Sequence, residues 1–129
     1  MLIFFGKMYS QTFIGKTKEE ILTIQMENSN KMSDKATDDT LGYHMAFNDS
    51  QRLITHVFLF NKKDICYGYS IWTSDKGLVE WIKKDIEKIA QEKISENSWV
   101  QKYNNKVYGW QLKQTGEYFY SFSTSQIKQ

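Results

Sequence analysis

Two histidines and one cysteine are the residues of this 129-residue chain best suited to bind a metal or to act in catalysis. His44 and His56 fall in neighbouring runs of alternating polar and apolar residues, 41–47 and 52–60. Successive side chains of a strand point to opposite faces, so pairing His56 with Tyr43 places His44 on the other face. We therefore expect no shared metal, because no Asp, Glu or Cys is placed to complete a set of ligands. We expect His56 to lie near a core edge, with a hydrogen bond to a tyrosine hydroxyl or a backbone group.

Cys66 is the only cysteine, so the chain can form no internal disulfide and no site built from several thiolates. In the run 65–72 it is expected opposite Leu59, on the face away from the core, as a small filling side chain rather than a nucleophile. The neighbouring Asp38 and Asp39 lack the alternating oxygens and the glycine of a calcium loop. We predict no catalytic, cofactor-binding or metal-binding residue.

A short motif, Gly15-Lys16-Thr17, resembles the end of a phosphate-binding P-loop. The full motif needs another glycine five positions before Gly15, where Ser10 stands. A helix start explains the same residues without a ligand, because Thr17 as N-cap and Glu20 three positions later form a capping box. We therefore predict a helix from about 17 to 28 and reject nucleotide binding.

The strongest pattern is a long antiparallel hairpin from Arg52 to Trp72, in which residues 61–64 form the turn. If Phe60 faces Ile65, one face is apolar or aromatic at every position but one, as a sheet that covers a helix requires. That face would hold Ile54, His56, Phe58, Phe60, Ile65, Tyr67, Tyr69 and Ile71. The run 41–47 would add a third strand, with Met45 opposite Ile54.

A second helix is predicted over residues 76–94, with its apolar stripe on Leu78, Trp81, Ile82, Ile86 and Ile89. A second hairpin follows, 106–113 with 117–124, and Trp99-Val100 form an extra short strand or a lead-in. We expect Gly116 at positive φ in a three-residue loop. That register pairs Lys113 with Glu117, Leu112 with Tyr118, Trp110 with Tyr120 and Tyr108 with Phe122. The two hairpins and the helix should bury Phe58, Tyr67, Trp81, Ile82, Trp110 and Tyr120 together.

The predicted order is α-βββ-α-ββ, an α+β fold with one antiparallel sheet of about five strands and two helices on one face. Residues 13–125 form the single domain and 126–129 a tail, and no internal repeat is evident. If the helices cover only one face, Val57, Leu59 and Phe119 form an apolar patch on the other. Such a patch usually marks an interface, unless residues 29–40 or the N-terminal segment lie over it.

Charge and composition argue against two classes of partner, nucleic acids and the interior of a membrane. Net charge is +2 and Arg52 is the only arginine, which argues against a nucleic-acid reader because guanidinium supplies the bidentate contacts to bases and phosphates. No apolar run approaches the roughly 18 residues of a membrane span. Residues 1–12 are a leader, the remnant of an export signal or a short first strand. The stretch 1–5 looks like the tail of a signal but lacks a basic region before it.

The segments FIGKTKEEIL, LGYHMAF and FLFNKKDICYGY together resemble small exported bacterial α+β proteins of unassigned role. Such proteins resemble the outer-membrane-assembly lipoprotein and β-lactamase-inhibitor-like folds, with a helix start before an antiparallel meander. The resemblance covers about residues 13–72 and carries over no functional residue. The lipid-attachment cysteine of the lipoproteins is absent near the start. The element order is also similar to type III secretion chaperones, which are strongly acidic, unlike this chain.

We therefore expect an exported, periplasmic or extracellular, non-enzymatic module without a cofactor. It would bind another protein through its open sheet face or an edge strand. The alternative is a small cytoplasmic enzyme or ligand carrier, with a pocket between sheet and helix lined by His56, Tyr43 and Tyr69. A filled core at that place would favour the module.

Overall fold

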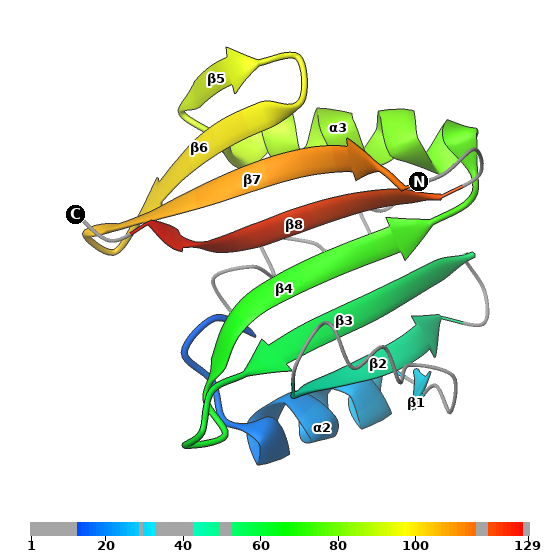
Figure 1. Cartoon of the computed structure of the whole chain (residues 1–129), viewed down its shortest axis with the longest axis vertical. Helices are drawn as coiled ribbons and strands as arrows, with labels where there is room; N and C mark the ends of the chain where they lie inside the picture. The colour runs from blue at the N-terminus through cyan, green and yellow to red at the C-terminus, as the bar shows by residue number, and fades with distance from the viewer. Residues whose placement is uncertain (1–12, 29, 33–42, 50–52, 116–118, 128–129) are drawn as a thin grey trace.

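The computed structural model describes residues 13–28, 30–32, 43–49, 53–115 and 119–127. Neither of the helices in this part of the chain is long and apolar enough to cross a membrane. The elements, labelled as in Figure 1, are α2 (Lys18–Glu27), β1 (Lys31–Met32), β2 (His44–Asp49), β3 (Ile54–Phe60), β4 (Cys66–Thr73), α3 (Lys76–Ile89), β5 (Glu92–Ser95), β6 (Ser98–Tyr103), β7 (Lys106–Gln114) and β8 (Tyr120–Ile127).

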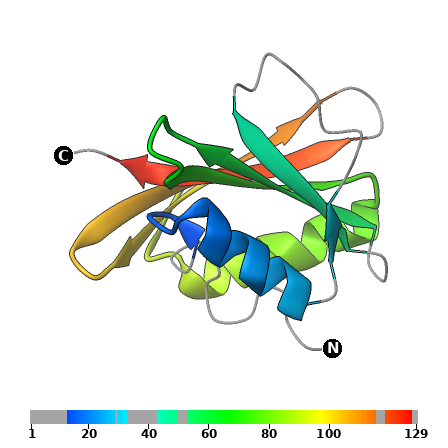
Figure 2. The same ribbon diagram turned by 90° about the horizontal axis from the view of Figure 1, so that it is seen from below.

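The eight strands form one antiparallel sheet in the order β1-β2-β3-β4-β8-β7-β6-β5. Helix α2 precedes the meander β1–β4, and α3 precedes the meander β5–β8. The last strands of the two meanders, β4 and β8, pair in the middle of the sheet, a contact that we call the seam. The strand order is therefore the same from either edge, and the chain is an α-ββββ unit built twice. Both helices lie on the same face of the sheet (Figure 2).

The fold class is confirmed, but the sheet has eight strands rather than about five. Helix α3 ends at Ile89, not at 94, because Ala90 is already extended, with ψ 138°. The amide of Gln91 then donates to the carbonyl of Val100 at 3.0 Å, which starts the β5–β6 hairpin. Trp99 was predicted only as part of an extra short strand or lead-in. It is buried in β6, and its packing in the core holds this hairpin in the sheet.

The predicted registers of the β2–β3 and β7–β8 pairs are wrong in partner but right in face. Met45 pairs with Phe58 instead of Ile54, and Trp110 with Thr124 instead of Tyr120. Each partner lies four residues from the predicted one, and an even shift leaves every side chain on its predicted face. The loop between β7 and β8 is longer than expected.

That longer loop changes the second hairpin. The amide of Thr115 donates to the carbonyl of Phe119 at 2.8 Å, so Lys113 pairs with Ser121 rather than with Glu117. Gly116, for which we predicted positive φ, lies outside the described residues, as do Glu117 and Tyr118.

A bulge in the first long hairpin also departs from the prediction. Phe60 pairs with Cys66 and Leu59 with Gly68, so Tyr67 is the extra residue of β4. Tyr67 was expected in the core, yet 47% of it is exposed. Cys66 was expected on the opposite face, yet it is buried in the core. One inserted residue exchanges the faces of its neighbours.

The core fills the space between the sheet and the two helices. Helix α3 contributes Val79, Ile82 and Ile86 to it, but 48% of Trp81 is exposed, against our prediction that it is buried. The buried arc of the helix is centred on Ile82, and Trp81 lies at its margin. The tryptophans that fill the core are Trp99 and Trp110, both on the helix-covered face of the second meander.

Candidate functional site

The structure separates the two histidines as the alternation predicted. His44 pairs with Leu59, whereas His56 pairs with Phe47, so the imidazoles lie on opposite faces. His56 is buried, and its Nδ1 lies 2.7 Å from the hydroxyl oxygen of Tyr69. The two rings are stacked, with centroids 5.9 Å apart. The expected hydrogen bond to a tyrosine is confirmed, and it gives His56 a structural role in the core.

The place of the alternative pocket, between sheet and helix beside His56, is filled by aromatic rings. Phe13 packs against Phe58 at a centroid distance of 4.9 Å and against Tyr69 at 5.0 Å. Tyr43 was expected beside His56 but lies beside Phe60, because the register is shifted. Its hydroxyl accepts a hydrogen bond from the ammonium group of Lys18 at the start of α2. The three proposed pocket residues therefore do not line a common space.

Cys66 is a poor nucleophile in this fold. Its thiol is buried and donates to the carbonyl of Gly68 at a sulfur–oxygen distance of 3.2 Å. Burial raises the pKa of the Cys66 thiol to about 12. The reactive form of a thiol is the thiolate, and almost none exists near neutral pH at such a pKa. The interpretation of Cys66 as a filling side chain is supported, although on the other face of the sheet.

The P-loop-like motif serves the start of α2. Thr17 Oγ1 accepts from the amide of Glu20, whose carboxylate accepts from the amide of Thr17, and this reciprocal pair is the predicted capping box. Lys16 forms an ion pair with Glu20 at 3.6 Å. Gly15 has φ 91°, and its amide donates to the carbonyl of Cys66. These groups tie the helix to β4.

One buried carboxylate lies at the margin of α3. Asp85 is buried, and its partner is Lys88, at 3.9 Å. Burial raises the pKa of Asp85, and the nearby Lys88 ammonium opposes this rise only in part. A raised pKa means that the ionised form is less stable in the folded chain than in the unfolded chain.

Changing Asp85 to Asn is therefore expected to stabilise the protein near neutral pH, because asparagine has the same shape without the charge. The penalty is fully present above the raised pKa of Asp85 and disappears as the pH falls through it toward about 4, the ordinary value of an aspartate. Urea unfolding of both proteins across this range should show a difference that closes in acid. A difference that is constant with pH, or an Asp85→Asn variant less stable than the wild type at neutral pH, would contradict this assignment.

The face of the sheet that the helices leave uncovered carries mostly small or polar residues around the seam. The strand pairing places these residues in three rows that run across β7, β8 and β4. Because most of these side chains are small, this part of the sheet surface is a hollow between larger neighbours. From β7 across β8 to β4, the rows are Lys113, Ser121 and Trp72; Gln111, Ser123 and Ser70; and Gly109, Ser125 and Gly68.

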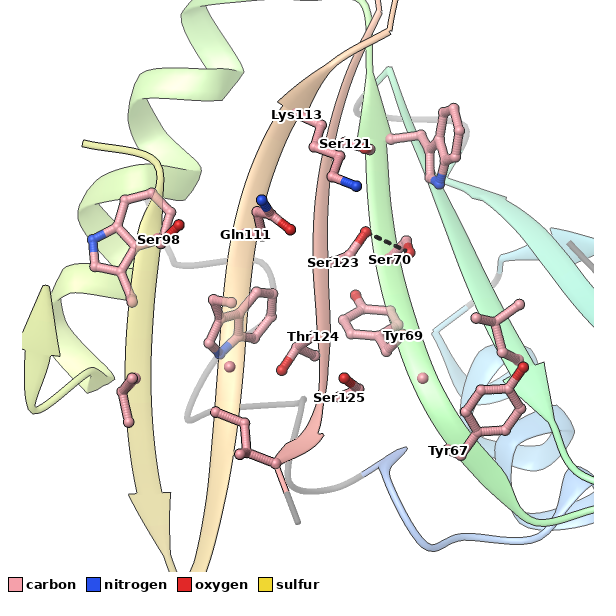
Figure 3. A pocket seen from close by; sticks show the side chains of 18 of the residues that line it. Tyr67, Tyr69, Ser70, Ser98, Gln111, Lys113, Ser121, Ser123, Thr124 and Ser125 are labelled. Atoms are coloured by element: carbon pink, nitrogen blue, oxygen red, sulfur yellow. Dashed lines mark hydrogen bonds between the residues drawn. The ribbon is translucent and has the colours of Figure 1, made fainter. Parts of the chain in front are cut away.

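This hollow is a groove of about 760 Å³ that crosses β4, β8, β7 and β6. We refer to it as the seam groove. Figure 3 shows the hydroxyls of Ser121, Ser123 and Ser125 following one another along β8, with Gln111 and Lys113 on β7 beside them. The hydroxyl oxygens of Ser70 and Ser123 lie 3.0 Å apart across the seam. The groove therefore has a polar floor of short side chains on both meanders.

Larger apolar side chains flank this floor. Tyr67 and Leu59 stand on the side of the first meander, and Ile127 on the side of the second. About half of Tyr67 and of Ile94 is exposed, at 47% and 58%, and 42% of Ile127. The predicted apolar patch is thus only partly observed, since Val57 is buried and Leu59 half-buried. Phe119, the third residue of the predicted patch, is exposed.

Among the described residues, no group of three or more His, Cys, Asp or Glu side chains is close enough to hold a metal ion. Asp38 and Asp39 lie outside that part. Comparison of the chain with protein families, with curated proteins and with solved structures finds no match. The seam groove is therefore the candidate site on geometric grounds alone.

Proposed function

We propose that this protein is a non-enzymatic binding module that holds a segment of another protein in the seam groove. The observation that carries the proposal is the uneven cover of the sheet: two helices pack on one face, and the groove opens on the other. A polar floor with apolar flanks can accept both the backbone and the side chains of a polypeptide. The groove also crosses the seam, so that both meanders contribute to one surface.

The filled core favours this proposal over the alternative, an enzyme or ligand carrier. That alternative requires a pocket beside His56, and Phe13 and Phe58 pack against Tyr69 there. His56 is engaged with Tyr69, and the high pKa of Cys66 leaves it protonated. The nucleophile–base pair that an acyl-transfer enzyme would need is not formed by these residues. Export and a periplasmic or extracellular location stay predictions from residues 1–12, which lie outside the described part of the chain.

Site-specific crosslinking tests the proposal. A photoreactive amino acid at Ser123, in the floor of the groove, should give defined adducts with another protein in cells that make this chain. The same amino acid at Lys84, exposed on α3, is the matched control and should not give these adducts. Identical adducts from both positions, or none that depend on the groove, would contradict a binding role for this face.

A second variant measures how much the groove contributes. Ser123→Trp places a bulky ring in the floor and is expected to weaken binding of a crosslinked partner at least about tenfold, or about 1.4 kcal/mol. Ser123 is half-buried beside the open groove, so the larger side chain has room and the fold should persist. Titration of the purified partner gives the affinity, and circular dichroism checks the fold. Unchanged affinity with an intact fold would exclude the groove as the contact.

A further inference from the structure

The described residues that line the seam groove carry positive charge and no negative charge. Lys113 is the only charged residue among those that line it, and no carboxylate is among them. Its ammonium group has no ion-pair partner among the described residues. Three lysines elsewhere in this part of the chain do form ion pairs: Lys16 and Lys88 with carboxylates on the helices, and Lys93 with Glu87 of α3.

A neighbouring hydroxyl in the same row adds a hydrogen-bond donor to this charge. Lys113 pairs with Ser121, and Ser121 pairs with Trp72, so the three residues stand side by side on β7, β8 and β4. Adjacent strands are about 4.8 Å apart. The indole N–H of Trp72 is buried and has no acceptor in the described structure, so it is not a donor at the surface of the groove. The Lys113 cation beside the Ser121 hydroxyl is complementary to oxygen acceptors with negative charge.

We propose that the seam groove recognises an acidic segment of a protein partner, with an Asp or Glu carboxylate bound at Lys113. This proposal rests on the proposed function and specifies the chemistry of its partner. A polypeptide fits better than a nucleic acid, because a phosphate backbone needs several cations in a line and the groove offers one. The aliphatic flanks, Leu59, Val100 and Ile127, suit the apolar side chains of a peptide that carries the acid.

A displayed library of random peptide loops tests the specificity without knowledge of the partner. Loops are selected on the wild-type protein and counter-selected on Ser123→Trp, so that the survivors bind the groove. Survivors should be enriched in Asp and Glu. Lys113→Glu should reduce the affinity for these loops at least tenfold, and selection on that variant should enrich Lys and Arg instead. Lys84→Glu makes the same charge change on the exposed surface of α3 and should leave the affinity unchanged.

The outcomes separate this proposal from the proposed function. Groove-dependent loops without acidic preference, or loops indifferent to Lys113→Glu, would overturn the acidic partner and leave a protein-binding groove. If no selected loop loses binding in Ser123→Trp, the result would contradict both the acidic partner and the protein-binding role of the groove. Binding of a poly-dT oligonucleotide that is lost in Lys113→Glu would overturn the proposal in favour of a nucleic acid. Urea unfolding should show that Lys113→Glu, an exposed position, retains the wild-type stability.

Discussion

Replacement of Trp110 by alanine is expected to lower the free energy of unfolding by about 3–5 kcal/mol. Trp110 is 2% exposed and packs edge-on against Tyr69 across the sheet. Its indole N–H also donates to Oε1 of Gln101 at 3.0 Å. Truncation therefore leaves a cavity and at the same time deprives the Gln101 oxygen of this donor. Such a loss is a large part of the stability of a domain of this size, and urea denaturation measures it.

Trp81 is the matched control for this measurement. Nearly half of its surface is exposed at the margin of α3. Trp81→Ala should therefore cost at most about 1 kcal/mol, because little of the ring leaves the core and a helix tolerates alanine well. Equal losses from both substitutions would show that Trp81 is buried in the core, as the sequence predicted, and not at its margin.

The sequence predicted the face of the sheet on which each side chain lies better than its pairing partner on the next strand. Period-two alternation assigned Trp110, Leu112, Tyr108 and Phe122 to the covered face, and they lie there. Their cross-strand partners were wrong because alternation is unchanged by an even shift, so only the turns can fix the register. The turn between β7 and β8 is a longer loop than Gly116 suggested. Alternation alone therefore could not select between the registers.

Two local features were missed for different reasons. The bulge at Tyr67 adds one residue, and the alternation does not mark its place, so the faces of Cys66 and Tyr67 were assigned the wrong way round. The β6–β7 turn did have a signal. Asn104 and Asn105 both have positive φ, 50° and 64°, and an asparagine pair suits a two-residue hairpin turn. That pair would have extended the predicted second hairpin to a third strand.

The candidate site was harder to predict than the fold. Ser121, Ser123 and Ser125 alternate with core residues on β8, and alternate serines on a strand are usually solvated surface. They form a groove only because β4 pairs with β8 and sets Gly68 and Ser70 beside them. That pairing joins strands that are separated in the chain by α3 and three further strands. The two units share a topology and no evident sequence pattern, so nothing in the residue pattern indicated the seam.

The seam itself should make the two units unfold together. Phe122 is fully buried on β8, and it pairs with Ile71 of β4 and packs against Trp99 of β6. Phe122→Ala is expected to destabilise the protein by about 3–5 kcal/mol. Because the sheet runs continuously through the seam, the loss should affect both meanders in one cooperative transition.

Native-state hydrogen exchange distinguishes this from local damage. The amides of β3, in the first meander, and of β7, in the second, should exchange faster in Phe122→Ala by a similar factor. Ser125→Ala changes an exposed residue on the other face of the same strand and should leave both rates nearly unchanged. Faster exchange confined to β6, β7 and β8 would show that the first meander is stable without its partner. The repeated α-ββββ units would then be two folding units joined by an interface, and the seam groove would be a site between them.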